Sequence, residues 1–166
     1  MNSEQRTRAL DLVLREALYL DQRRWDDWLQ LYAQDCVFWM PMWKSETEPT
    51  ADPEQELSFI YLQGRASLQE RARRVSSGLS IASMPIPRTS HLVGPGLVST
   101  QDGGQTVLLQ SAFRSQAYLH KDNQLVEYAG RYTHVLQAAG DGYLIRQKTI
   151  FINCDYLQSK LDFFYI

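Results

Sequence analysis

The sequence has only three histidines and two cysteines among its 166 residues, and this scarcity excludes most metal sites. Neither Cys36 nor Cys154 has a histidine or another cysteine at the spacing that zinc or iron–sulfur ligands need. No spacing among His91, His120 and His134 selects two of them, together with a carboxylate, for a mononuclear iron site. We therefore expect no metal site and no cofactor site in this chain, and two reduced, buried thiols.

The chain also lacks a strong net charge, long apolar runs, and the motifs of phosphate-binding or serine-nucleophile sites. Its formal charge of −2 and its pI near 5.9 give no electrostatic argument for binding nucleic acid or an anionic membrane surface. No segment approaches about 18 consecutive apolar residues, and the amino-terminal stretch is charged where a signal peptide would be apolar. We therefore expect a cytoplasmic protein that binds neither nucleic acid nor membrane.

What is present is an ordinary globular composition with 44% hydrophobic residues, which indicates one domain over residues 1–166. A helix is predicted over Ser3–Gln22, with an apolar stripe from which Glu16 is excluded. All four tryptophans lie in residues 20–43. This segment predicts a second helix through Trp25, Trp28 and Tyr32 that Asp35 ends, followed directly by a strand over residues 36–40.

The rest of the chain changes from loops and one helix to long strands. Residues 44–56 are predicted as a polar loop and residues 57–62 as a strand. Ser67 and Glu70 have the capping-box spacing that opens a helix, which Gly78 ends. Residues 79–95 are predicted as loop. Strands follow at residues 97–101, 106–121, 124–139 and 143–156, separated by Gly, Asn and Asp turns.

This order of elements predicts an α+β fold in which a curved antiparallel sheet wraps around the amino-terminal helices, because long strands must twist and coil. Arg114, Arg131, Arg146 and Lys148 lie on neighbouring strands among tyrosines, which indicates either a face that meets another protein or a solvated face. Arg88 and His91 follow two prolines. They are predicted either to anchor a pocket or partner, or to lock the loop.

Several ordered motifs resemble the β (small) subunit of bacterial aromatic-ring-hydroxylating dioxygenases. The resemblance covers almost the whole chain, and the ordering and spacing of the motifs make it specific. The motifs are Leu20-Asp21-x-Arg-x-Trp-x-x-Trp-Leu-x-Leu-Tyr-x-x-Asp35, Phe38-Trp39-Met-Pro41, Asp52-Pro53-x-x-Glu56-Leu-Ser-x-Ile60-Tyr61, Gly64-Arg65-x-x-Leu68-x-x-Arg71, Ser83-x-Pro85-x-Pro87-Arg88-Thr89-x-His91 and Leu161-Asp162-Phe163-Phe164-Tyr165-Ile166. The sequence departs from the family pattern at Gly94-Pro95-Gly96, which leaves the strand boundary there open.

The resemblance implies a cone-shaped fold of the nuclear-transport-factor-2 (NTF2-like, cystatin-like) type. It also implies a mainly structural subunit within a heterohexamer of three α and three β subunits. In that family the α subunit holds a Rieske 2Fe-2S cluster and a mononuclear Fe(II), and a separate reductase supplies electrons from NADH. The motifs look most like members acting on aromatic carboxylates, namely benzoate, 2-halobenzoate or anthranilate.

Two other hypotheses remain open from the residues alone. One is a stand-alone cone-fold isomerase or dehydratase whose acid–base pair comes from Tyr32, Asp35, His91 or His134. In that case the cone interior would be open, whereas Trp25, Trp28, Trp39 and Phe38 are bulky enough to fill it. The other hypothesis is an adaptor that binds an unrelated protein through the arginine- and tyrosine-rich sheet face.

Overall fold

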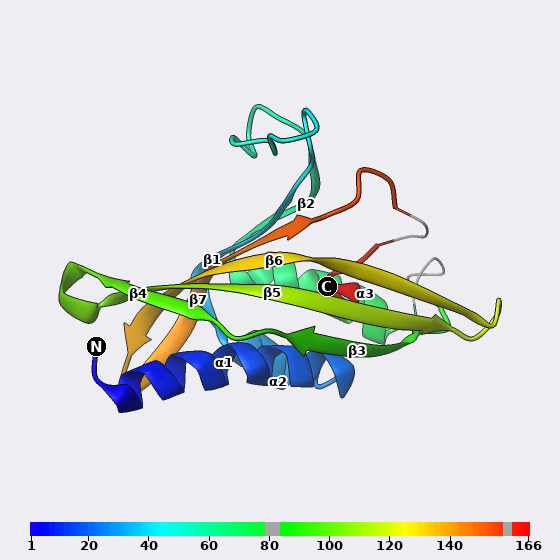
Figure 1. The fold of residues 1–166 in the computed structure, drawn as a ribbon. Coiled ribbons are helices and arrows are strands. Elements are labelled where there is room, and N and C mark those ends of the chain that lie inside the picture. The colour runs from blue at the N-terminus through cyan, green and yellow to red at the C-terminus, as the bar shows by residue number, and fades with distance from the viewer. Residues whose placement is uncertain (79–83, 158–160) are drawn as a thin grey trace.

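The computed structural model describes residues 1–78, 84–157 and 161–166, and Figure 1 shows the arrangement of their helices and strands. Long strands form one sheet, and the helices pack on one side of it. The helices are α1 (Ser3–Asp21), α2 (Trp25–Gln30) and α3 (Arg65–Ser76), and the short 3-10 helices are η2 (Asp102–Gly104) and η3 (Phe163–Tyr165). The strands are β1 (Tyr32–Pro41), β2 (Ser58–Gln63), β3 (Arg88–Val93), β4 (Leu97–Gln101), β5 (Thr106–Leu119), β6 (Gln124–Ala139) and β7 (Gly142–Ile152).

The sheet has the strand order β2-β1-β7-β6-β5-β3, and β4 also pairs with β5. The predicted hairpins β5–β6 and β6–β7 are confirmed, with strands of 14, 16 and 11 residues. One neighbouring pair, β1 with β7, is parallel, so the predicted antiparallel sheet contains a single exception. The helix α1 contacts β3, β5 and β7, whereas α3 contacts β1 and β2, so the curved sheet holds both helices as predicted.

The helix predicted at the amino terminus is confirmed, but its buried stripe was assigned incorrectly at Leu14, Glu16 and Leu18. Asn2 and Gln5 form a capping box that satisfies the free N–H groups of the first turn. Glu16 lies on the buried stripe of α1, at 1% exposure, whereas Leu14 and Leu18 are exposed. Because Glu16 is charged, its burial requires a partner inside the protein.

Two predicted helix boundaries near the tryptophans and near Ser67 are wrong. The second helix ends at Gln30, and Tyr32 and Asp35 belong to β1, because the Ile145 N–H donates to the Leu31 carbonyl and draws the chain into the sheet. The capping box at Ser67 does not form, since the Ser67 hydroxyl donates to the Gln63 carbonyl. The helix α3 instead follows Gly64, whose φ of 77° suits glycine.

The loop predicted over residues 79–95 contains a strand. Its first part, residues 79–83, lies outside the described residues, but residues 88–93 form β3 and pair with β5. Gly94-Pro95-Gly96 separates β3 from β4, and both strands pair with β5 at different places. The boundary that the sequence left open is therefore a break between two edge strands.

An irregularity in the β6–β7 register moves Lys148 away from Arg146. Leu136 pairs with Ile145 but Val135 pairs with Gln147, so Arg146 is an extra residue. Strict alternation places Arg146 and Lys148 on one face, and that expectation is wrong. Arg146 is exposed, whereas Lys148 points into the core at 1% exposure.

The interior is filled mainly by aromatic side chains from the beginning and end of the chain. Trp28 and Phe38 are fully buried, and Phe163 stacks on Trp28 with 4.9 Å between ring centroids. Trp39, which was expected in the interior, lies on the opposite face of β1, where its indole N–H donates to the Ser58 hydroxyl at 2.9 Å. The carboxy-terminal segment thus packs against the helix–strand junction identified from the sequence.

A close backbone approach makes Gly130 in β6 sensitive to substitution. A Cβ atom at this position would lie 1.9 Å from the Phe151 carbonyl oxygen of β7, so Gly130→Ala must move backbone. We expect a loss of at least about 2 kcal/mol in the free energy of unfolding, measured by urea denaturation. Gly142→Ala is the matched control, because nothing lies within 4 Å of its added Cβ. Equal stability of the two variants would contradict this packing.

Candidate functional site

The centre of the interior holds a buried ion pair between α1 and β7. Lys148 Nζ lies 2.9 Å from Glu16 Oε1, and both side chains are 1% exposed. The Tyr32 hydroxyl of β1 donates to the same carboxylate oxygen at 2.5 Å. His134 Nε2 of β6 lies 3.3 Å from Glu16 Oε2. Glu16 therefore connects one helix to three strands of the sheet.

The pKa shifts of this cluster describe one charged pair and one neutral histidine. Burial raises the pKa of Glu16, but the charge of Lys148 and the hydrogen bonds from His134 and Tyr32 outweigh it and hold that pKa far below its ordinary value. Burial lowers the pKa of His134, and Glu16 only partly opposes this effect. Neutral His134 then carries its proton on Nε2, because the carboxylate of Glu16 can only accept. The cluster has no net charge.

Aromatic rings enclose the ammonium group of Lys148. Its Nζ lies 4.3 Å from the ring centroid of Tyr132 and 5.6 Å from that of Phe38. Tyr132 in turn stacks on Phe113 with an interplanar angle of 4°. Cation–π contacts are strongest where the cation has lost its water, as here. These polar groups thus contact one another and the surrounding rings.

A second polar cluster ties the end of α1 to the edge strand β3. The carboxylate of Asp21 accepts from the His91 backbone N–H and from the Thr89 hydroxyl, each at 2.9 Å, and lies 2.6 Å from His91 Nδ1. Burial raises the pKa of Asp21, but the hydrogen bonds from His91 and Thr89 and the charge interaction with His91 lower it below its ordinary value. The cluster blocks part of an exposed sheet edge.

The four residues predicted for an acid–base pocket do not form one site, because only Tyr32 and His134 lie together, both on Glu16. Asp35 is exposed and lies 3.7 Å from Arg146 Nε, whereas His91 pairs with Asp21 and His134 with Glu16. Sequence reasoning missed both Glu16 and Asp21 as partners. The available signal was a carboxylate at the position where the apolar stripe of the first helix continues through Leu12, Val13 and Ala17.

Four of the six residues predicted for an interface are exposed. Arg114 on β5 donates to both carboxylate oxygens of Glu127 on β6, at 2.8 and 2.7 Å. The guanidinium of Arg131 lies 4.2 Å from the Phe151 ring centroid. Arg88 and Arg146 are also exposed, at the start of β3 and at the irregularity of β7. The side chains of Lys148 and His91 are 1% exposed and are not available at the surface.

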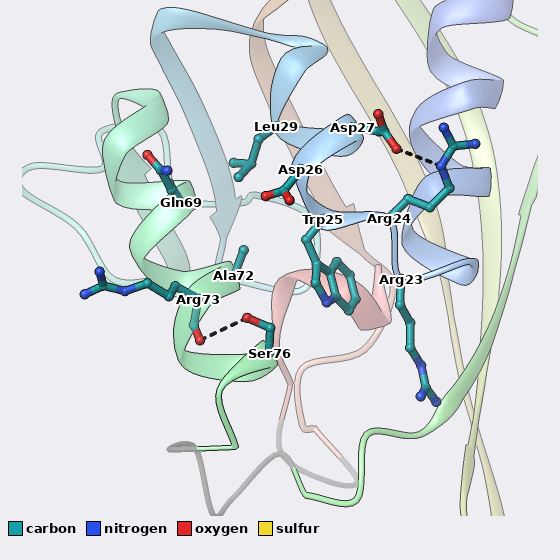
Figure 2. A pocket seen from close by; sticks show the side chains of 10 residues that line it. All are labelled: Arg23, Arg24, Trp25, Asp26, Asp27, Leu29, Gln69, Ala72, Arg73 and Ser76. Carbon is teal, nitrogen blue, oxygen red and sulfur yellow. Dashed lines mark hydrogen bonds and ion pairs between the residues drawn. The ribbon is translucent and has the colours of Figure 1, made fainter.

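The described residues also outline a surface groove between α2 and α3, shown in Figure 2. Its volume is about 330 Å³. Trp25, Leu29 and Ala72 supply apolar atoms, and Arg73 lies on the α3 side with Asp26 on the α2 side. The groove thus combines apolar surface with charged side chains of both signs, because Arg23, Arg24 and Asp27 also line it.

Within residues 1–78, 84–157 and 161–166, no three His, Cys, Asp or Glu residues gather closely enough to hold a metal ion. Among these same residues, no helix has the length and apolar character needed to cross a membrane.

Comparisons with known proteins identify this architecture. The family described as "Ring hydroxylating beta subunit" matches residues 15–159. The chain is 32% identical to the benzoate 1,2-dioxygenase subunit beta of Acinetobacter baylyi, over 91% of this chain and 88% of that one. It is 31% identical to the toluate 1,2-dioxygenase subunit beta of Pseudomonas putida, over 94% of each chain. The crystal structure of the benzoate 1,2-dioxygenase beta subunit of Burkholderia mallei superposes with a TM-score of 0.77 at 28% identity, over 95% of each chain.

The fold is therefore the cone-shaped α+β fold of the nuclear-transport-factor-2 type that the resemblance implied. The chain belongs to the ring hydroxylating beta subunit family. It is the small, non-catalytic component of an aromatic-ring-hydroxylating dioxygenase, as predicted. The isomerase or dehydratase hypothesis has no comparable support.

Removing one partner of the buried ion pair should lower the free energy of unfolding strongly, whereas replacing both partners should lower it much less. We expect Lys148→Met or Glu16→Leu to lower the free energy of unfolding by about 3–5 kcal/mol, because each leaves a buried charge unpaired. The double variant Glu16→Leu/Lys148→Met should recover most of this loss. Urea denaturation of the four proteins gives the double-mutant cycle. Additive losses in the double variant would contradict the pairing.

Neutral burial of His134 predicts that acidification destabilises the fold. Since its pKa is lowered on folding, the unfolded chain binds a proton more readily below about pH 6.5. The free energy of unfolding should therefore fall between about pH 7 and about pH 5, by up to about 1.4 kcal/mol per pH unit from this one proton. His134→Gln should flatten this slope, and His120→Gln is the control. An unchanged slope in His134→Gln would refute the assignment.

Proposed function

We propose that this chain assembles and supports a dioxygenase that acts on an aromatic carboxylate. Its partner is an α subunit with a Rieske 2Fe-2S cluster and a mononuclear Fe(II). The two subunits form a heterohexamer with three copies of each, and a separate reductase passes electrons from NADH to the complex in the cytoplasm. The relatives named for benzoate and toluate support this substrate class.

The observation that carries the structural role is the occupied interior. Where a cone-fold enzyme would need a pocket, Glu16 and Lys148 neutralise each other among buried rings. Tyr32 and His134 are also committed to Glu16, so they are not free to exchange protons with a substrate. The acid–base candidates inside this chain are thus used for packing.

The outer face of the β5–β6–β7 sheet is the surface that we assign to the α subunit. It carries the Arg114–Glu127 pair and the Arg131 guanidinium stacked on Phe151. Leu92 on β3 and Leu97 on β4 are 71% and 76% exposed beside it. Arginine combined with exposed apolar surface is typical of protein interfaces.

Co-expression with the adjacent oxygenase α subunit tests this function. We expect the two chains to purify together with bound iron and to convert benzoate or a substituted benzoate when the reductase and NADH are supplied. This chain alone should convert none of these substrates. Failure of this chain to bind any Rieske α subunit would contradict the proposal.

Variants of the former acid–base candidates separate a structural role from a catalytic one. Asp35→Ala and His91→Gln should leave turnover per iron within about twofold of the original in the intact complex, because Asp35 is exposed beside Arg146 and His91 is paired with Asp21. Turnover and iron content are measured on the same purified complex. A selective loss of turnover in an intact hexamer would favour a catalytic site within this cone.

A further inference from the structure

The segment between β1 and β2 forms an acidic arm, defined here as residues 44–57. It contains one lysine and five carboxylates: Lys44, Glu46, Glu48, Asp52, Glu54 and Glu56. Figure 1 shows this segment projecting beyond the body of the sheet, at the far end of β1 and β2. Most of its residues are exposed, and Leu57 at its base is 74% exposed. The arm thus presents negative charge and an apolar side chain away from the core.

Hydrogen bonds within the segment hold the arm in shape. The Lys44 N–H donates to the Glu48 carbonyl at 3.0 Å, and the Thr50 N–H donates to the Met42 carbonyl at 2.8 Å. The Glu56 carboxylate accepts from the Ala51 N–H at 2.5 Å and from the Asp52 N–H at 2.9 Å, and these two hydrogen bonds lower the pKa of Glu56. An arm ordered in this way loses little conformational entropy when it binds.

The arm contains carboxylates that are not used to build it. Among the described residues, the side chains of Glu46 and Glu54 take part in no ion pair and no hydrogen bond. Their charges are therefore available to an external cation.

The surface with the opposite charge on the same chain is α3. This helix carries four arginines and one acid: Arg65, Arg71, Arg73, Arg74 and Glu70. Arg73 is 75% exposed even though it pairs with Glu70, and the exposed Arg74 side chain forms no ion pair or hydrogen bond with the described residues. The groove of Figure 2 runs beside Arg73, and the partly exposed Trp25 of α2 supplies its accessible apolar surface, since Leu29 and Ala72 are buried.

We propose that the acidic arm of one copy docks on the arginine face of α3 in a second copy of this chain. The charges are complementary, and the exposed Leu57 matches the apolar part of the groove beside α3. Because the two surfaces are different patches of one chain, the contact is heterologous and each copy offers one arm and one α3. Repetition of such a contact closes a ring, which agrees with the three copies in the proposed function on which this inference rests.

Charge reversal in the co-purified complex tests the contact. Glu46→Arg/Glu54→Arg reverses the arm, and Arg73→Glu/Arg74→Glu reverses α3. Each double variant should raise the protein concentration at which the complex dissociates by about tenfold or more, since like charges then face each other. Combining all four substitutions in one chain should restore the original stoichiometry, because the charges are complementary again. Mass photometry at low salt measures the masses of the species present.

A matched variant controls for net charge. Asp11→Arg/Asp122→Arg changes the net charge by the same amount as the arm reversal. It does so at two exposed residues whose side chains form no ion pair among the described residues. It should leave the complex intact. Thermal unfolding of every variant, followed by circular dichroism, separates lost assembly from lost folding.

The outcomes separate this inference from the proposed function. If the variant with all four substitutions assembles like the original complex, the result supports docking between copies. If the complex stays intact after reversal of the arm alone, the result overturns that docking. Loss of the α subunit from the arm variant without rescue by α3 reversal also overturns it, and assigns the arm to the α subunit. If the unmodified chain binds no α subunit, the proposed function fails, whereas dissociation of its own copies still tests the contact.

Discussion

The structure depends on the burial of one carboxylate, Glu16, in the apolar stripe of α1. Burying a charge is unfavourable unless it is paired and hydrogen-bonded, so the sheet must present Lys148, Tyr32 and His134 at matching positions. These residues come from three strands, so the contacts of Glu16 hold α1 against β1, β6 and β7 at the same time. The ion pair therefore gives the helix a defined position more than it adds stability.

Because these buried groups are used to stabilise the fold, the surfaces that can contact other molecules lie on the outside of the chain. The groups that could carry acid–base chemistry hold the fold together, and aromatic rings occupy the space around them. What the chain offers to other molecules is an arginine-bearing sheet face, an acidic arm and a basic helix. A family whose members are small subunits of larger enzymes agrees with this distribution.

Local signals in the sequence were enough for most elements. The hairpin turns and the long alternating strands predicted β4, β5 and β6 nearly to the residue, and the capped amphipathic helix α1 was also predicted. The central contact was not predictable, because Glu16 and Lys148 are 132 residues apart and no local pattern relates them. Alternation also failed at Arg146, where one extra residue moves Lys148 to the inner face. The parallel pairing of β1 with β7 likewise depends on tertiary structure.

Turnover by a complex without the buried charges tests the central claim most directly. The chain carrying Glu16→Leu and Lys148→Met is assembled with its α subunit, and product formation is measured per bound iron. If the interior only positions α1 and supports assembly, turnover per iron stays within about twofold of the original complex. A loss of turnover of more than about tenfold, in a complex of unchanged mass and iron content, would show that the buried pair takes part in the chemistry and would contradict the account.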